Sequence, residues 1–336
     1  MHIRSFALSL IAVALLAFGG IGAVAAQDAT PLAEGTIFPE LTLTLTDAGV
    51  EGLPAETTAG WTNVTFTNSV TPTGDPFEDT WGIDFILLPE GMTVDDVAAA
   101  LAAPPDGEGE GESMEGMDMA SPEAMEGMDM GSPEAAAEDP FAFLYEAYLP
   151  GGPGALNGET GQATIFLEPG TYAVGAFGLG TPVEMTVTGT ADPAAPGAVA
   201  ADATITETGT SGSFDFTGTL PEGEGVIEIY NDSDQPHFVE AIYSPTPITE
   251  DDVMRLLMME EGATPAPGGP DFSQISVAFI TGTQSAGTTQ YITADLQPGY
   301  YVLLCFVGDP QQGGIPHSFA GMIEVIETGA GATPAA

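Results

Sequence analysis

The residues of this chain with the clearest capacity for chemistry are one cysteine, two histidines and a methionine. Cys305 is the only cysteine of the sequence, His317 and Met322 follow it, and His237 lies in an earlier segment. Two imidazoles, a thiolate and a thioether form a soft ligand set that suits copper, with the methionine as a weak axial ligand. The residue types therefore predict one copper site built from these four side chains.

Two other interpretations stay open for the same residues. Cys305 ends the apolar segment "YYVLLCF", where a free cysteine can serve as a small buried hydrophobe while the histidines make ordinary hydrogen bonds. Another metal is the second alternative, but a thioether is a poor fourth ligand for zinc.

The elements expected to position these residues are short strands. Segments such as "GVIEIYN", "FVEAIYS" and "QISVAFI" are rich in β-branched and aromatic residues, and Gly, Pro, Asn and Asp separate them. His237 follows one such strand, Cys305 ends another, and His317 and Met322 lie in the next loop. The pattern predicts an antiparallel β-sandwich.

The chain carries this unit twice. "TWGIDFILLPEGMTVDDVAAALA" (80–102) matches "PHFVEAIYSPTPITEDDVMRLLM" (236–258), and "LEPGTYAVGAFG" (167–178) matches "LQPGYYVLLCFVG" (296–308). Such self-similarity indicates two copies of one structural unit.

Each copy is expected to hold one short helix between its strands. The helix begins at Thr93 or Thr249, and an aspartate three residues later, Asp96 or Asp252, completes a capping box.

The ligand positions are not repeated. Aligning the copies places Trp81 opposite His237 and Ala176 opposite Cys305, and no histidine follows in the first copy. The first copy is therefore expected to lack a copper site, and a structural or partner-binding role is predicted for it.

The second copy resembles the cupredoxins, in particular the plastocyanin-like type 1 blue copper proteins. Asn231 and Pro236 precede the first histidine in the family's order, Cys305 ends a strand, and "HSFAGM" has the family's spacing between histidine and methionine. The resemblance implies a Greek-key β-sandwich and one-electron transfer. It also implies equatorial copper ligands at His237, Cys305 and His317 and an axial ligand at Met322.

Two features depart from the family pattern. Eleven residues, "FVGDPQQGGIP", separate Cys305 from His317, where small cupredoxins usually have two to four. Phe238 also occupies a position where plastocyanin-like proteins commonly have an asparagine that supports the ligand loops.

The predicted organisation is all-β, with two tandem cupredoxin-like Greek-key β-sandwiches. A basic start, an apolar run and small residues before Gln27 predict a signal peptide cleaved after Ala26. The expected segments are a signal peptide (1–26), a first domain without copper ligands (28–190) containing a disordered Met/Asp/Glu-rich insertion (103–140), a linker (191–203), a copper-binding domain (204–328) and a disordered tail (329–336).

The insertion repeats the unit "MEGMDMxSPEA". Closely spaced thioethers can hold Cu(I) without a folded pocket, and a disordered acidic loop without a ligand is the alternative. The candidate Cu(I)-capturing residues are Met114, Met117, Met119, Met125, Met128 and Met130.

Charge restricts the partners. The sequence has 49 acidic residues against two basic ones, Arg4 and Arg255, for a formal net charge of −47. Such a field opposes binding to nucleic acid and anionic membranes and would attract a basic redox partner protein, and the alternative is that it serves solubility in a salty or otherwise harsh exterior. With the signal peptide removed, we expect no stable membrane insertion and a secreted, periplasmic or cell-envelope location.

The predicted function is one-electron transfer or extracytoplasmic copper handling by a single copper ion in the second domain. An enzyme is not expected, because multicopper chemistry needs many more histidine ligands than this sequence contains. The alternatives are a metal-free secreted interaction or envelope module and a copper-sequestering protein loaded by the methionine segment.

Overall fold

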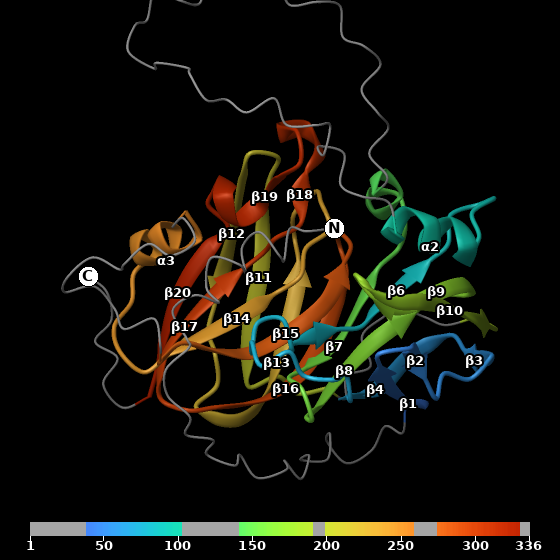
Figure 1. Ribbon diagram of the computed structural model, residues 1–336, viewed down its shortest axis with the longest axis horizontal. Helices are drawn as coiled ribbons and strands as arrows, with labels where there is room; N and C mark the ends of the chain where they lie inside the picture. Colours follow the sequence, from blue (N-terminus) through green and yellow to red (C-terminus); the bar gives the residue numbers. More distant parts are fainter. Residues whose placement is uncertain (1–37, 103–140, 191–198, 259–273, 330–336) are drawn as a thin grey trace, which may run out of the picture.

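A computed structural model of the chain describes residues 38–102, 141–190, 199–258 and 274–329 (Figure 1). Within these residues strands predominate, together with two short α-helices and a few 3-10 turns. The prediction of an all-β protein is confirmed. The predicted signal peptide, the methionine-rich insertion and most of the predicted linker and tail lie outside the described residues.

Ten strands and one α-helix make up the first copy of the repeat. The helix is α2 (Val94–Ala102), and a 3-10 turn, η1 (Ala142–Tyr145), precedes the seventh strand. The strands are β1 (Glu40–Thr46), β2 (Gly49–Glu51), β3 (Glu56–Thr58), β4 (Gly60–Asn68), β5 (Trp81–Gly82), β6 (Asp84–Leu87), β7 (Pro150–Ala155), β8 (Thr160–Leu167), β9 (Gly170–Ala176) and β10 (Leu179–Thr188).

The second copy also has ten strands and one α-helix. Its helix is α3 (Glu250–Leu257), and its 3-10 turns are η3 (Pro310–Gln312) and η4 (His317–Ala320). The strands are β11 (Ala203–Thr210), β12 (Ser213–Gly218), β13 (Gly223–Asn231), β14 (Glu240–Ser244), β15 (Ser276–Gln284), β16 (Thr289–Leu296), β17 (Gly299–Leu304), β18 (Gly308–Asp309), β19 (Ile315–Pro316) and β20 (Ile323–Thr328).

Alternation of side chains explains why these segments are strands with one buried face. Along β13, for example, Val226 is partly exposed while Ile227 and Ile229 on either side of Glu228 are fully buried. Successive residues of a strand point to opposite faces, so this pattern turns one face toward a core. The buried faces of both copies meet in one large hydrophobic cluster.

The central strands pair in the same way in the two copies. In the first, β4 pairs in parallel with β1 and antiparallel with β8; in the second, β13 pairs in parallel with β11 and antiparallel with β16. The opposite layer repeats as well, with β6–β9–β10 corresponding to β14–β17–β20. The sequence repeat is therefore a repeat of topology.

Equivalent strands of the two copies also pair with each other. β8 pairs antiparallel with β16 and β7 pairs antiparallel with β15, which gives an eight-stranded and a six-stranded sheet that each run through both copies. Since antiparallel partners exchange backbone hydrogen bonds across the junction, the copies are joined by their backbones as well as by side chains.

Glycines make this close junction possible. A Cβ atom added to Gly152 of β7 would lie 2.1 Å from the carbonyl oxygen of Ile83, and one added to Gly282 of β15 would lie 2.2 Å from the same atom. No real side chain tolerates such contacts, so the strand "PGGPGA" owes its place in the sheet to its glycines.

The two helices lie on opposite sides of the molecule in Figure 1, where α2 packs against side chains of β6 and β9 and α3 packs against side chains of β14, β15, β17 and β20. Thr249 caps α3 with Asp252 in a complete capping box, and Thr93 and Asp96 exchange the same pair of hydrogen bonds at α2. Both predicted helix starts are confirmed. None of the helices in the described residues is both long enough and apolar enough to cross a membrane.

Candidate metal centre

Three of the four predicted ligands converge in the second copy. Cys305 directly follows β17, His237 lies between β13 and β14, and His317 begins η4. The Cys305 Sγ lies 3.6 Å from His237 Nδ1 and 3.7 Å from His317 Nδ1, and the two nitrogens are 2.9 Å apart. All three side chains are fully buried.

The backbone fixes where each ligand emerges. His237 exchanges two backbone hydrogen bonds with Gln284 at the end of β15, with N···O distances of 3.0 and 2.7 Å. The N–H of His317 donates to the carbonyl of Val307, and the N–H of Ser318 donates to the carbonyl of Cys305. Backbone hydrogen bonds between neighbouring chain segments thus bring the three ligand residues together.

The eleven residues between Cys305 and His317 form a small hairpin that closes on itself. β18 pairs antiparallel with β19, and η3 with left-handed Gly313 and Gly314 makes the turn. Positive φ angles favour glycine at such positions. The long spacer therefore returns the chain to the site, so its length does not prevent His317 from reaching Cys305.

Asp309 anchors this hairpin from inside. Its carboxylate accepts hydrogen bonds from the Ser211 hydroxyl and from the backbone N–H groups of Gly212 and Gln311. Burial alone would raise the pKa of Asp309, but these bonds and one from Gln235 hold it below the usual value. The carboxylate is therefore ionised at neutral pH and links the hairpin to the β11–β12 turn.

Gln235 connects Asp309 to a ligand. Its Nε2 donates to Asp309 Oδ1 at 3.1 Å, which turns its Oε1 toward His317 Nε2, also at 3.1 Å. An amide oxygen can only accept, so His317 carries its proton on Nε2. The Nδ1 atom of His317 then faces the site with a lone pair.

Ser233 has the same effect on the other histidine. The single hydroxyl proton of Ser233 is directed to Asn231 Oδ1 or to the carbonyl of Gln235, so Ser233 Oγ accepts from His237 Nε2 at 2.7 Å. The Nδ1 atom of His237 is therefore also unprotonated. Asn231 supports this loop, since its amide donates to the carbonyls of Gln235 and Gln284.

The result is two imidazole lone pairs 2.9 Å apart beside one thiol. A thiol supplies a single proton, so in the absence of a cation at least one of these buried nitrogens lacks a donor. Two atoms bound to one ion at about 2.0–2.3 Å can lie no more than about 4.0–4.6 Å apart, and all three separations satisfy that limit. The donor set and its spacing fit a single soft metal ion.

Burial sets the protonation of the ligands. Removal from water lowers the pKa of His237 to about 2, with a further contribution from His317, and lowers the pKa of His317 to about 4. Burial raises the pKa of the Cys305 thiol. Hydrogen bonds from the backbone N–H groups of Phe238 and Val307 lower this pKa by a smaller amount. At neutral pH the histidines are ready to bind a metal, and the thiol must first lose its proton.

Phe214 closes the site on one side. Its ring centroid lies 4.8 Å from that of His237 and 4.3 Å from that of His317. Ring packing at these distances excludes water and restrains both imidazoles. Phe238, which replaces the asparagine of the family pattern, contributes through its backbone N–H toward the sulfur, so this support does not depend on the type of side chain.

Met322 lies fully buried in the same hydrophobic cluster as Cys305, and its N–H donates to the carbonyl of His317 at 2.9 Å.

The six methionines predicted to capture Cu(I) lie outside the described residues. Met185 of the first copy is buried in the core. Within the described parts of the chain, His237, Cys305 and His317 form the one group of three metal-ligating side chains of this kind.

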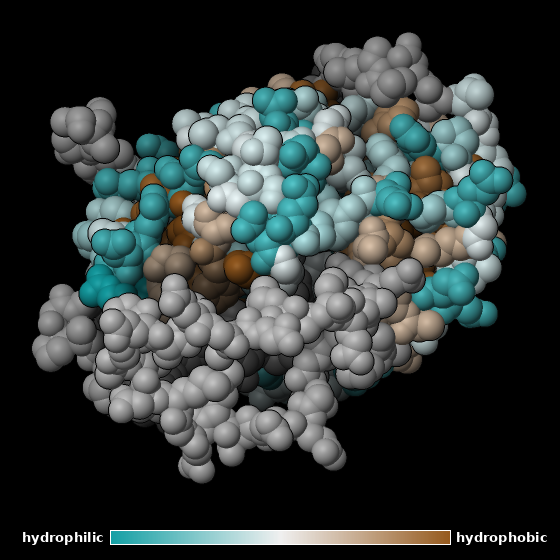
Figure 2. Space-filling view, turned by 90° about the horizontal axis from the view of Figure 1, so that it is seen from above, coloured by the Kyte–Doolittle hydropathy of each residue, from teal (hydrophilic) through white to brown (hydrophobic). Residues whose placement is uncertain are grey.

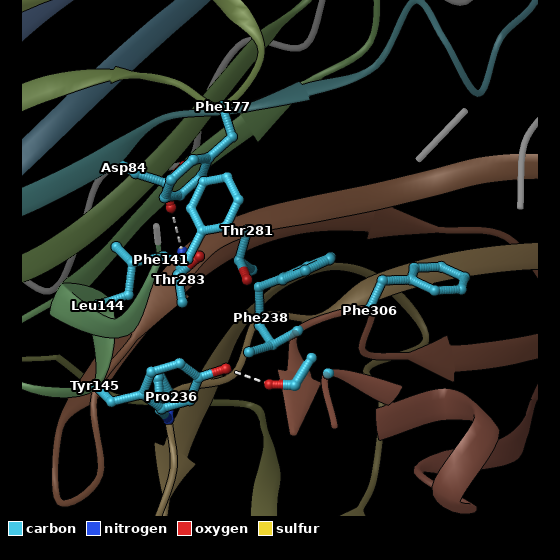
Figure 3. A pocket seen from close by; sticks show the side chains of 13 residues that line it. Asp84, Phe141, Leu144, Tyr145, Phe177, Pro236, Phe238, Thr281, Thr283 and Phe306 are labelled. Atoms are coloured by element: carbon cyan, nitrogen blue, oxygen red, sulfur yellow. Dashed lines mark hydrogen bonds between the residues drawn. The ribbon is translucent and has the colours of Figure 1, made fainter. Parts of the chain in front are cut away.

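An apolar pocket of about 190 Å³ lies beside the site, between the two copies (Figure 3). The first copy contributes Phe141, Tyr145 and Phe177, and the second contributes Phe238 and Phe306. The hydroxyl of Tyr145 donates to the carbonyl of Gly308 in the hairpin. Since Phe238 and Phe306 directly follow His237 and Cys305, the junction of the copies reaches the immediate neighbours of two ligands.

Sequence reasoning missed Ser233, Gln235 and Asp309. A polar run before the Pro-His pair, "NDSDQPH", and the turn-forming "DP" after Cys305 are the signals that precede them. Neither signal indicates on its own that these side chains orient the histidines.

Comparisons with known proteins give several copper proteins as similar structures. Auracyanin from Roseiflexus castenholzii is 22% identical and covers 38% of this chain and 95% of its own, with a TM-score of 0.25. Copper nitrite reductase from Nitrosomonas europaea is 12% identical over 88% of this chain and 96% of its own, with a TM-score of 0.22. A multi-copper oxidase from Pediococcus acidilactici is 9% identical over 86% of this chain and 59% of its own, with a TM-score of 0.19.

No family model and no curated protein sequence matches the chain. These identities and TM-scores make the similarity a weak structural likeness to copper proteins. The expectation that the protein is not an enzyme is contradicted, because the similar structures include a nitrite reductase and multicopper oxidases, which are enzymes.

Proposed function

We propose that the protein is an extracytoplasmic copper protein that binds one copper ion through His237, Cys305 and His317, with Met322 as axial ligand. The observation that carries the proposal is the pair of unprotonated Nδ1 atoms, 2.9 Å apart and fully buried beside a thiol. The fixed protons on both Nε2 atoms leave a metal as the partner that satisfies both lone pairs.

The donor types favour copper over other metals. The described residues bring two nitrogens and one sulfur to the site without a carboxylate, and copper prefers such nitrogen and sulfur ligands. Copper held by these side chains would cycle between Cu(I) and Cu(II) and so accept and release one electron.

The protein itself supplies rigidity for this chemistry. Ser233, Gln235 and Phe214 restrain the two imidazoles, so hydrogen bonds and ring packing within the protein fix the positions of the ligand nitrogens. A site that does not rearrange between oxidation states transfers electrons with a smaller reorganisation cost. This preformed geometry supports electron transfer.

Charge supports a basic redox partner. In Figure 2 hydrophilic residues cover much of the coloured part of one face, with smaller apolar areas between them. The only basic residue with an ion pair in the described chain, Arg255, is engaged with Asp252. A surface of this charge attracts positively charged proteins and raises their rate of association.

Titration of the purified protein with Cu(II) tests the proposal. We expect intense visible absorption that saturates at one copper per chain and disappears in Cys305→Ala and in His317→Ala. Met185→Leu, which changes a buried methionine of the first copy, is the matched control and should retain the absorption. Tight colourless binding of Cu(I) alone would favour copper sequestration, and no binding of either ion would leave the metal-free interaction module.

A further inference from the structure

Glu207 of β11 is a buried acid that the site described above does not use. Its side chain and that of Gln284 are fully buried, and the two are hydrogen-bonded, with Gln284 Nε2 donating to Glu207 Oε2 at 2.9 Å. On the same two side chains, Glu207 Oε1 and Gln284 Oε1 have no hydrogen-bond partner. Two unpartnered oxygens on neighbouring buried groups require an explanation, because such atoms are costly.

The orientation of the Gln284 amide does not remove the difficulty. Its Nε2 also points to the carbonyl of Ile229 at 3.5 Å. Exchanging the amide nitrogen and oxygen would place an acceptor against that carbonyl and against Glu207 Oε2. The observed orientation is therefore the better one, and both Oε1 atoms remain acceptors without a donor.

A proton on Glu207 resolves both deficits at once. A carboxylic acid is a donor as well as an acceptor, so Glu207 Oε1–H can supply the donor that Gln284 Oε1 lacks. We propose that Glu207 is held as a neutral acid that pairs with the Gln284 amide, and that this pair is a positioning group for the copper site. The role assigned to the pair rests on the proposed copper function, whereas the protonation of Glu207 does not.

Gln284 transmits the effect to a ligand. Its backbone exchanges two hydrogen bonds with His237, and its carbonyl also accepts from Asn231 Nδ2. A Gln284 side chain fixed on both of its polar atoms holds the end of β15, and β15 in turn fixes the loop that carries His237. Glu207 is therefore connected to the first ligand through one residue.

The charge of Glu207 also affects the Cys305 sulfur. Negative charge on Glu207 raises the pKa of the Cys305 thiol and so opposes the thiolate that binds copper. The residues that pair with Glu207 across β11 are Phe216 on β12 and Asn231 on β13, and neither carries charge. Within the described chain, Cys305 is thus the titratable group that the charge of Glu207 is shown to affect, with His237 and His317 beyond it.

Burial supports the neutral state, since it raises the pKa of Glu207 to about 8 while the bond from Gln284 acts in the opposite direction. Above that pH the proton leaves to solvent and Glu207 becomes negatively charged, a charge that acts on Cys305. Such a charge stabilises Cu(II) over Cu(I), so the reduction potential falls as pH rises.

Infrared spectroscopy of the metal-free protein tests the protonation directly. At pH 7 we expect a carbonyl band of a buried carboxylic acid that is lost in Glu207→Gln and retained in Glu222→Gln, an exposed control. The band should disappear from the unmodified protein as pH rises through about 8. Absence of the band at pH 7, or its persistence in Glu207→Gln, would overturn the proposal whether or not copper binds.

The reduction potential of the copper-loaded protein tests the link to the site. Glutamine preserves the pair as an amide–amide contact, so Glu207→Gln should match the unmodified potential at pH 6. Between pH 6 and pH 9 the potential should fall in the unmodified protein and stay constant in Glu207→Gln. A constant potential in the unmodified protein, or an equal fall in both, would contradict the positioning role even if the infrared band is present.

Discussion

At the scale of single residues, the second layer of hydrogen bonds is what turns two histidines into ligands. Ser233 and Gln235 each hold one Nε2 proton, so that both Nδ1 atoms point a lone pair at the sulfur of Cys305. A histidine whose distal nitrogen is fixed has one tautomer and one ring orientation. The centre of the site is therefore defined by the three converging side chains of Cys305, His237 and His317 together with Ser233 and Gln235, which orient the two histidines.

Gln235→Leu is expected to weaken copper binding about 10–100-fold, the usual cost of losing a residue that orients a metal-bound histidine. The leucine removes the acceptor of His317 Nε2 and one donor of Asp309. Competition with a copper chelator measures the effect. Gln297→Leu, which changes an exposed glutamine, is the control, and equal affinities in the two variants would show that His317 needs no such partner.

Copper affinity should rise about tenfold per pH unit between pH 5 and pH 7, because binding replaces the one proton of the Cys305 thiol. The pKa values of His237 and His317 lie at about 2 and about 4, so neither histidine binds a proton in this range. Below pH 4 protonation of His317 makes the dependence steeper. Chelator competition at several pH values measures the slope, and a slope of zero between pH 5 and pH 7 is incompatible with a thiolate ligand.

At the scale of elements, glycine-rich β7 and β15 bind the two copies of the repeat together. Backbone atoms from Ile83, Ile280 and Gly154 occupy the positions where side chains would otherwise stand. The same junction borders the pocket that includes Phe238 and Phe306, which follow two ligands. A change in the packing of the junction can therefore move Phe238 and Phe306 and, with them, the neighbouring ligands His237 and Cys305.

Gly152→Ala should lower the free energy of unfolding by about 1–3 kcal/mol, because the new methyl group would lie 2.1 Å from the carbonyl oxygen of Ile83 and the strands must shift. Urea unfolding of the metal-free protein measures the loss. Gly158→Asn is the control: its position is open and left-handed, and asparagine tolerates that conformation. An equal loss in both variants would argue against a steric role for the junction.

Local patterns were sufficient for much of the fold. The capped start of α3 at Thr249 and the strand that ends at Cys305 follow from the order of apolar, β-branched and turn-forming residues, and the ligand types follow from their rarity. β7 was not predicted, since "PGGPGA" has no side chains that favour a strand and its pairing depends on β15 and β5, which lie on either side of it. Gln235 and Asp309 were missed for a related reason: their roles depend on partners far away in the sequence.

At the scale of the whole molecule, the strongest feature is charge. The sequence carries 49 acidic and two basic residues. The side chains of Cys305, His237 and His317, by contrast, are fully buried beneath the surface. A field of this size acts over about 10 Å at 0.1 M salt and becomes weaker as salt is added. We therefore expect the charge of the surface, and not the metal ligands, to determine which redox partner binds.

Electron exchange between the copper-loaded protein and a basic haem protein should slow steeply as ionic strength rises from 0.01 to 0.5 M, because screening removes the attraction. Stopped-flow absorbance measures the rate. Reduction by an uncharged small molecule is the control and should change little over the same range. A rate for the haem protein that is independent of salt would show that the acidic surface does not guide its partner.

The central claim is that one copper ion binds Cys305, His237 and His317 in the second copy of the repeat. X-ray absorption at the copper edge of the fully loaded protein tests it most directly, since it reports the atoms bonded to the metal. We predict one short copper–sulfur bond and two imidazole nitrogens, with the sulfur bond lost in Cys305→Ala. A first shell of oxygen and nitrogen alone, or one unchanged by removal of Cys305, would contradict the claim.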